Sequence, residues 1–290
     1  MTKVAIVTDS NSGITQSEAE ELGITVLPMP FMIGDEEYFE GKNLSEQWFY
    51  EQQRADVDIS SSQPAPGAVT QLWTQLLERF DQVLHIPMTS GLSGSCGTAL
   101  GLKESFGGRV EVADNHRISV PQKHCVHEAV ELAKKGMDAL GIRKMLEKAK
   151  DDSSIYITVD TLKYLKKGGR ITPAVAAIGT FLRIKPVLQI QGEKLDTFCN
   201  ARTMNQAKKI MIKALRDDIE NRFGGLDAHD VYIDVAYTNN RGDALIFRDE
   251  IEEAIPGYKV GFVDPLALSI GCHTGEGVLA CAATRRLHTA

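Results

Sequence analysis

The stretch Met88-Thr89-Ser90-Gly91-Leu92-Ser93-Gly94-Ser95-Cys96 follows an apolar run at 82–87 and precedes a helix-compatible run at 98–103. This order predicts a β-strand, a tight loop and the N-terminus of an α-helix. In an α/β protein such a loop suits an anion, because glycines allow close approach while backbone N–H groups and serine hydroxyls donate hydrogen bonds. The stretch therefore predicts a cradle for a carboxylate or phosphate around Ser93. An ordinary helix N-cap is the alternative.

Two further loops carry hydroxyl side chains. The first, at 9–13, follows a β-rich run, and the second, at 60–64, precedes a helical pattern. Considered alone, each is also typical of a simple turn or a surface linker. Ligands of parallel α/β sheets lie at the carboxyl ends of the strands, so we expect these loops to meet the loop at 89–95 there.

Strand and helix patterns alternate along the whole chain. This predicts an α/β protein of two domains, residues 1–152 and 153–290, the first with a mostly parallel sheet covered by helices on both faces. In the second, an apolar segment at 173–182 predicts a helix and the polar residues at 191–194 predict a hairpin turn. An apolar run at 24–33, interrupted by two prolines, predicts an edge strand or a broken one.

Composition excludes several classes of protein. The 290 residues carry a net charge of −7, which gives no support to nucleic-acid binding. No apolar run is long enough to span a bilayer, and the N-terminal residues lack a signal-peptide pattern, so we expect a cytoplasmic protein. The five cysteines form no C-x-x-C pair, and His124 and His127 lack a third ligand, so neither a disulfide framework nor a metal site is expected.

Two residues of the second half are candidates for a polar role. Arg170 follows a glycine pair that is also typical of an ordinary helix C-cap, and an arginine fixed there can face an anion or a partner. His273 lies in the glycine-rich stretch 271–277, where little core is available to bury it, although a turn histidine without a function fits equally well.

The candidate residues suit the binding of an anion better than its chemical transformation. A serine hydrolase using Ser93 and His273 is weakened because the frame at 91–95 lacks the second glycine of a G-x-S-x-G elbow. Neither a P-loop nor a G-x-G-x-x-G motif follows a strand, so the sequence does not indicate a kinase by itself. Hydroxyls, amides, one histidine and one arginine remain, and these favour holding an anionic group.

Several motifs together resemble the DegV family of bacterial fatty-acid-binding proteins. They occur in the family's order and span nearly the whole chain: Thr8-Asp9-Ser10, Ser61-Ser62-Gln63-Pro64, Ser90-Gly91-Leu92-Ser93-Gly94, Leu162 to Ile171 with its Lys-Lys-Gly-Gly-Arg run, Lys185-Pro186-Val187-Leu188, Arg202 and His273-Thr274-Gly275-Glu276-Gly277. Two positions depart from the family's pattern. Glu276 replaces a usual proline, and Ser61 replaces the commoner threonine.

The resemblance implies a two-domain α/β fold with a mostly parallel N-terminal sheet and a mixed C-terminal sheet. It implies a long-chain fatty acid in a buried apolar tunnel, its carboxylate held by the loops of Ser61, Ser62, Ser93 and Gly94, with His273 in the C-terminal glycine motif. Arg170 is implied to lie near the head group and the partner-facing surface.

The resemblance also implies a division of labour. The chain would be a lipid-binding carrier rather than an enzyme, and a separate ATP-dependent fatty acid kinase would make an acyl phosphate for phospholipid synthesis. No cofactor or metal is implied for the chain itself, no nucleic-acid partner, and at most transient contact with a membrane surface. The alternatives are a serine hydrolase or phosphotransferase using Ser93 and His273, and a sensor of a small metabolite.

Overall fold

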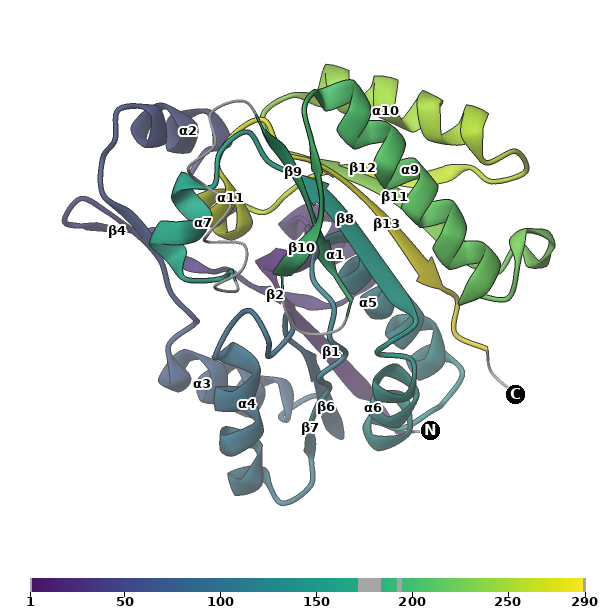
Figure 1. Ribbon diagram of the computed structural model, residues 1–290. Coiled ribbons are helices and arrows are strands. Elements are labelled where there is room, and N and C mark those ends of the chain that lie inside the picture. The colour runs from purple at the N-terminus through teal and green to yellow at the C-terminus, as the bar shows by residue number, and fades with distance from the viewer. Residues whose placement is uncertain (1, 172–183, 192–194, 289–290) are drawn as a thin grey trace. The chain divides into compact units, whose positions relative to one another are not determined.

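The computed structural model of the chain describes residues 2–171, 184–191 and 195–288 (Figure 1). The chain divides into two compact units, Met1–Lys150 and Asp151–Ala290, and each is described by itself. This division lies close to the predicted boundary after residue 152, and the roles assigned to the two domains stay predictions. The helix predicted at 173–182 and most of the turn predicted at 191–194 lie outside the described residues.

The first unit is built on a parallel sheet of four strands in the order β2-β1-β6-β7. These strands are β1 (Val4–Asp9), β2 (Thr25–Leu27), β6 (Gln82–Ile86) and β7 (Val110–Val112). Valine and isoleucine dominate them, as is usual where both faces of a sheet are buried. The run at 24–33, predicted as an edge strand or a broken one, is broken: β2 ends before Pro28 and lies at the edge of this sheet beside β1, and a strand of another sheet begins at Pro30.

Helices cover both faces of this sheet, as predicted (Figure 1). They are α1 (Gln16–Leu22), α3 (Pro66–Leu76), α4 (Ser95–Lys103), α5 (Ser119–Lys134) and α6 (Ala139–Lys148). On one face Trp73 of α3 and Ala99 of α4 pack against Val7 and Val83 of the sheet. On the other, α5 packs against β1, and α6 against β6 and β7. The burial of apolar side chains from both directions fixes the strands' register.

A separate antiparallel sheet in the first unit was not predicted. It consists of β3 (Pro30–Ile33), β4 (Glu36–Phe39) and β5 (Ile59–Ser61) in the order β4-β3-β5. The ring of Phe31 on β3 packs edge-on against Phe49 of helix α2 (Glu46–Arg54), with 5.8 Å between centroids. Strand β5 leads directly into the serine-rich segment at 61–64, so this sheet sets where that segment begins.

The second unit has a mixed sheet of six strands in the order β10-β9-β8-β13-β11-β12, as the resemblance implies. Its strands are β8 (Ser153–Thr158), β9 (Lys185–Ile190), β10 (Leu195–Ala201), β11 (Val231–Tyr237), β12 (Val260–Pro265) and β13 (Leu279–Arg285). All neighbouring pairs are antiparallel except β11 with β12.

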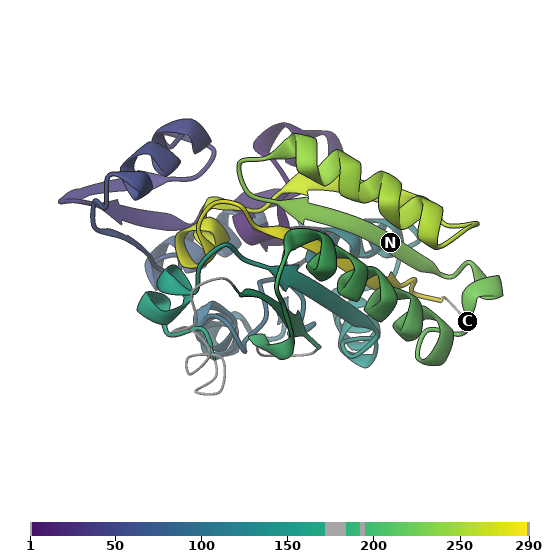
Figure 2. The same ribbon diagram turned by 45° about the horizontal axis from the view of Figure 1, so that its top comes forward.

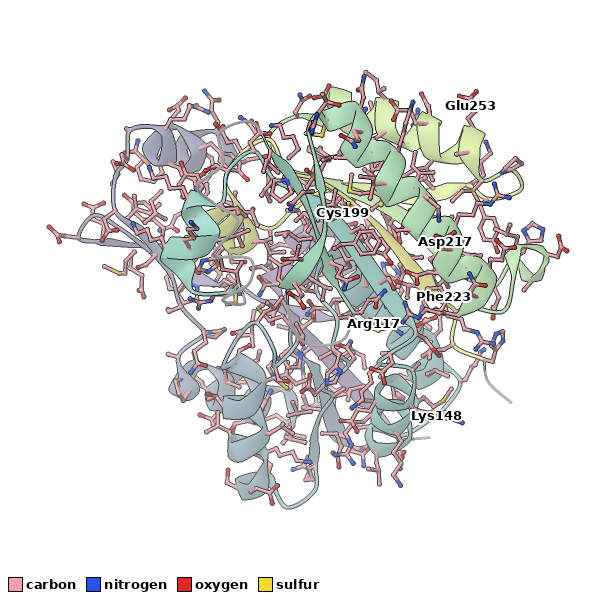
Figure 3. All side chains as sticks on the ribbon, in the orientation of Figure 1. Arg117, Lys148, Cys199, Asp217, Phe223 and Glu253 are labelled. Atoms are coloured by element: carbon pink, nitrogen blue, oxygen red, sulfur yellow. The ribbon has the colours of Figure 1, made fainter. Side chains whose placement is uncertain are left out.

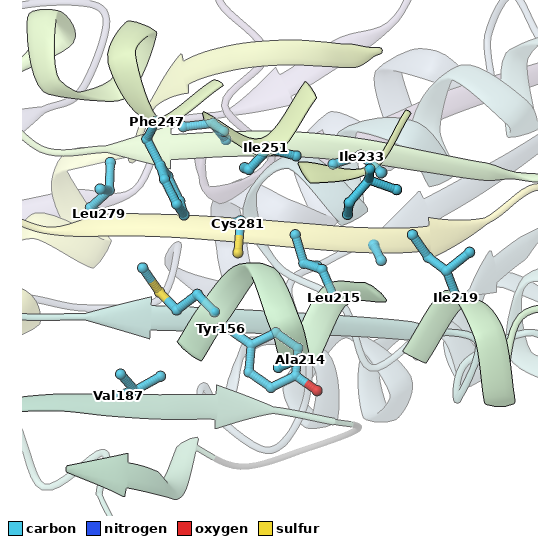
Figure 4. Packing of buried hydrophobic residues seen from close by; sticks show 14 of the residues in the cluster. Tyr156, Val187, Ala214, Leu215, Ile219, Ile233, Phe247, Ile251, Leu279 and Cys281 are labelled. Carbon is cyan, nitrogen blue, oxygen red and sulfur yellow. The ribbon is translucent and has the colours of Figure 1, made fainter. Parts of the chain in front are cut away.

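Two long helices, α9 (Met204–Asn221) and α10 (Arg241–Ala254), lie along one face of this mixed sheet (Figure 2). Between helices and sheet lies an apolar core, in which Leu215 of α9 and Phe247 of α10 meet Cys281 of β13 (Figure 4). Two short helices, α7 (Lys163–Gly168) and α11 (Leu268–Thr274), contact each other in the same unit. The residues predicted for the second half of a site lie on these two helices or directly after them.

Candidate functional site

The strand order of the parallel sheet reverses between β1 and β6, the position at which open α/β sheets bind ligands. Asp9, the last residue of β1, accepts a hydrogen bond from the amide of Met88 at 2.8 Å, just beyond β6. Burial raises the pKa of the Asp9 carboxyl, whereas hydrogen bonds from Met88 and Asn11 act to lower it. Asp9 therefore fixes the loop that follows β6 against the end of β1.

Thr89 organises the loop that carries Ser93. The Thr89 side chain is fully buried, and its hydroxyl accepts the amide of Gly91 at 3.2 Å. Its carbonyl accepts the amides of Leu92 and Ser93, both at 3.3 Å. Ser93 is half-buried, and its hydroxyl accepts the amide of Ser95 at 3.2 Å, at the first residue of α4. The N-cap residue of α4 is Gly94 rather than Ser93 and makes no side-chain cap hydrogen bond, and the anion cradle around Ser93 stays a prediction.

Gly94 is exposed, like Ser90 earlier in this loop. Within the described part of the chain, its amide donates to no hydrogen-bond acceptor. Gly94 precedes α4, where the helix dipole and the amides of the first turn favour a negative charge. The loop thus offers an anion an unused amide and a serine hydroxyl side by side.

The segment that contains Ser61 and Ser62 approaches the same helix. The Gln63 side-chain amide donates to the hydroxyl of Thr98 on α4 at 3.1 Å. A Cβ at Gly94 would lie 3.3 Å from Oε1 of Gln63, so the two loops are in close contact. Ser61 is half-buried and Ser62 exposed. The predicted meeting of the three hydroxyl loops in the first unit is therefore confirmed, and the roles of the individual serines stay predictions.

A cavity of about 10 Å³ lies at this junction. Its lining comes from all three loops and from β6, α3 and α4: Asp9, Pro64, Val69, His85, Pro87, Ser95, Thr98 and Ala99. The volume is about that of one water molecule and is too small for an acyl chain.

Arg170 and His273 lie together in the second unit. A side chain at Gly168, the last residue of α7, would overlap the ring of His273 on α11, so the ring lies directly on that glycine. Burial, and to a smaller extent the nearby charge of Arg170, lower the pKa of His273 to about 4. The imidazole is therefore neutral at physiological pH. Arg170 is exposed, and its guanidinium donates to the carbonyl of Gly168.

His273 corrects one expectation from the sequence. The stretch 271–277 has the pattern of a glycine-rich turn with little core around the histidine, but residues up to Thr274 form helix α11 and His273 is half-buried. The glycines serve close packing instead. Gly275 has φ = +80°, and a Cβ there would lie 2.6 Å from the Tyr164 ring. The glycines of this stretch are thus explained by close packing against α7 and not by an open turn.

Glu276 departs from the family's usual proline, and its carboxylate has a partner. The side-chain amide of Asn239 donates to Glu276 Oε1. Within the second unit, Gly277 lies against the Asp160 carboxylate, which in turn pairs with Lys185 at 2.6 Å. Two carboxylates therefore lie beside the glycine motif, and the neutral His273 does not offset their charge.

Two contacts that organise the site are missing from the sequence-based prediction. Gln122 of α5 donates to the Thr8 hydroxyl at 3.1 Å and to the Ile86 carbonyl at 3.2 Å, so it joins the ends of β1 and β6. Thr89 is the second, as described above. For Gln122, the sequence offers only a weak signal, a polar residue in the first turn of a buried helix. For Thr89 it offers none, because no local pattern distinguishes this residue from its hydroxyl neighbours.

The first unit supplies Ser93 with no base. Among its described residues, no histidine, lysine or carboxylate hydrogen-bonds the Ser93 hydroxyl. No group of three or more histidine, cysteine or acidic side chains within the described ranges is arranged to hold a metal ion. In the same ranges, no helix has the length and apolar character needed to cross a membrane.

Comparison with known proteins gives a consistent result. The family model described as "Uncharacterised protein, DegV family" matches residues 3–286. A DegV domain-containing protein of Listeria innocua is 32% identical over 282 residues, covering 96% of each chain. A DegV family protein from Thermus thermophilus, solved for its fatty acid binding, has a TM-score of 0.88 at 28% identity and covers 98% of this chain and 100% of its own. DegV from Bacillus subtilis, a fatty acid binding protein, has a TM-score of 0.85 at 27% identity, covering 99% and 100%.

Proposed function

The chain belongs to the DegV family, and from this premise we propose that it binds a long-chain fatty acid and presents the carboxylate to a separate ATP-dependent fatty acid kinase. The kinase forms an acyl phosphate for phospholipid synthesis in the cytoplasm. The chain acts as a carrier and does no chemistry itself. The fatty acid binding of two solved relatives supports the class of ligand.

The observation that carries this proposal is the arrangement of the Ser93 loop. A hydroxyl and an exposed amide, on Ser93 and Gly94, lie at the switch point and at the N-terminus of α4. This combination binds a carboxylate through charge-assisted hydrogen bonds. Ser61 and Ser62 add hydroxyls from the adjoining segment.

The head group needs only modest affinity from these loops. Each CH₂ of the acyl chain that leaves water contributes about 0.8 kcal/mol, so a buried tunnel supplies most of the binding free energy. The polar loops then have to satisfy the carboxylate and fix its position. A fatty acid is therefore a better match than a short polar metabolite.

In the second unit, His273 and Arg170 have properties that suit presentation of the carboxylate to the kinase. The neutral His273 is able to donate or accept one hydrogen bond without adding charge. Arg170 is exposed beside the lysines of α7, so it is available to a protein partner or to the phosphate of the product. We assign His273 to the head group and Arg170 to the kinase.

A binding titration tests the ligand site. We expect Ser93→Ala to weaken binding of a long-chain fatty acid about tenfold or more, because a hydrogen bond to a charged group contributes about 1.5–3 kcal/mol. Ser105→Ala is the matched control, since Ser105 lies after the other end of α4 and its hydroxyl donates to the Leu102 carbonyl. Equal affinities of Ser93→Ala and Ser105→Ala would remove Ser93 from the site.

A second assay separates binding from presentation. We expect Arg170→Ala to keep the fatty-acid affinity of the wild type and to reduce acyl phosphate formation when the kinase and ATP are added. Ser93→Ala should lower both. Acyl phosphate formation at the wild-type rate with Arg170→Ala, under subsaturating carrier, would contradict the assignment of Arg170.

A further inference from the structure

Arg117 carries a buried positive charge that the proposed function leaves unexplained. Its side chain is 1% exposed and lies in the first unit, in the loop that follows β7 (Figure 3). The guanidinium donates to the carbonyl of Ala149 at 2.7 Å and to the thiol of Cys125 at 3.0 Å. No carboxylate among the described residues pairs with it. A buried guanidinium without a counter-ion is costly, so a gain elsewhere has to offset it.

The Cys125 thiol does not supply that counter-ion. Burial raises its pKa to about 11, although the Arg117 charge opposes this. The sulfur is therefore a neutral, weak acceptor at physiological pH. The guanidinium acts through the positions of its two donor nitrogens. One hydrogen-bonds Cys125 of α5 and the other hydrogen-bonds Ala149, the residue that follows α6, so Arg117 joins the two helices.

The backbone around Arg117 is held in an unfavourable conformation. His116 has φ = 55° and Ser119 has φ = 58°, in the left-handed region that favours glycine. The amide of Arg117 donates to the Asn115 side chain at 3.1 Å. Such strain persists only where surrounding contacts determine it, and the two hydrogen bonds of the guanidinium are such contacts.

This loop directly contacts the loop that carries Ser93. The carbonyl of Arg117 accepts the amide of Thr89 at 2.9 Å, and the carbonyl of Thr89 accepts the amide of Ser93 at 3.3 Å. The Asp114 carboxylate also accepts the amide of Ser90 at 3.3 Å. Ser93 is thus two main-chain hydrogen bonds away from Arg117.

We propose that Arg117 is a positioning residue for the head-group site. Its guanidinium anchors the 114–119 loop to α5 and to the end of α6, and the carbonyl of that loop fixes Thr89 and through it the Ser93 hydroxyl and Gly94 amide. This inference rests on the proposed function, because the ligand it concerns is the carboxylate of a fatty acid. The sequence identified neither Arg117 nor its loop.

A double-mutant cycle on the full chain tests the inference, with a long-chain fatty acid as the probe. We expect Arg117→Met to weaken binding about tenfold and the pair Arg117→Met with Ser93→Ala to bind no more weakly than Ser93→Ala alone. If Arg117 had a merely structural role, Arg117→Met would lower the fatty-acid affinity of the wild type and of Ser93→Ala by the same factor. Arg143→Met is the matched control, because Arg143 lies on α6 of the same unit and contacts Glu111 outside the loop.

The outcomes separate the two proposals. Unchanged affinity in Ser93→Ala overturns the proposed site itself. Weakened affinity in Ser93→Ala with wild-type affinity in Arg117→Met, or full additivity of the two, overturns the role of Arg117 alone. Should Arg117→Met fail to fold, Arg117→Lys, which keeps the charge and loses the fork, replaces it. Its expected loss is about threefold in the wild-type background and none in Ser93→Ala.

Discussion

His85 of β6 is a buried imidazole that lines the small cavity beneath the Ser93 loop. It is 4% exposed, its ring lies edge-on to Trp73 at 5.6 Å, and neither ring nitrogen has a hydrogen-bond partner among the described residues. Burial lowers the pKa of His85 to about 3, from an ordinary value of 6.5. The folded protein therefore holds this ring in its neutral form.

The pKa of His85 predicts a loss of stability in acid. Between pH 6.5 and about 3 the unfolded chain binds a proton that the folded chain excludes, so the stability present above pH 6.5 is lost as the pH falls through this window. We expect His85→Phe, which keeps an aromatic ring, to flatten the dependence of the unfolding free energy on pH. Denaturant unfolding at pH 7 and pH 4.5 measures it. The same slope in both proteins would contradict the prediction.

At the scale of residues, the hydroxyl and glycine residues of the loops were predictable, and the residues that hold these loops in place were not. Ser93 and Gly94 stand out because small polar residues after an apolar run mark a loop at the end of a strand. Asp9 was predictable as a turn residue. Its hydrogen bond to Met88 was not, because the two residues lie 79 positions apart in the chain. Arg117 was not identified from the sequence, because its partners, Cys125 on α5 and Ala149 directly after α6, lie 8 and 32 positions further along the chain.

At the scale of elements, the glycine motif after α11 is explained by packing. Gly275 combines a positive φ with direct contact to the Tyr164 ring of α7. Gly101, inside α4, lies beside open space, because a Cβ there would meet no atom within 4 Å, and its φ is not positive. A side chain is therefore excluded at the first glycine and tolerated at the second.

We therefore expect alanine to have opposite effects at these two positions. Gly275→Ala should lower the free energy of unfolding by about 1–3 kcal/mol, because it adds backbone strain and overlaps Tyr164. Gly101→Ala should raise it by about 0.4–1 kcal/mol, because alanine is the better helix former and the space is open. Thermal or denaturant unfolding compares the two variants, and destabilisation by Gly101→Ala would refute this account.

The elements themselves were largely predictable where periodicity was strong. The helices α9 and α10 and strands such as β1, β6, β8 and β11 follow apolar patterns of the expected period, whereas β13 was not predicted as a strand. Strands β4 and β5, of four and three residues, were missed, whereas β3 lies within the run at 24–33 that was expected to form an edge strand or a broken one. Helix α11 was missed because its glycine and histidine are locally typical of a turn, whereas contact with α7 stabilises the helix.

At the scale of the whole molecule, each of the two units carries some of the residues that the sequence analysis singled out. The unit Met1–Lys150 carries the serine loops, and the unit Asp151–Ala290 carries Arg170 and His273. Alternating strand and helix patterns were sufficient to predict two α/β domains. They did not determine how each sheet is ordered, because strand order depends on long-range pairing that leaves no mark on local sequence.

The central claim is that the chain carries a long-chain fatty acid. The most direct test is native mass spectrometry of the full chain purified from bacterial cells, followed by extraction and identification of the bound lipid. The account predicts an added mass equal to one long-chain fatty acid, reduced or absent in Ser93→Ala and retained in Ser105→Ala. A chain that carries no acyl ligand and binds none of the fatty acids added to it would contradict the claim.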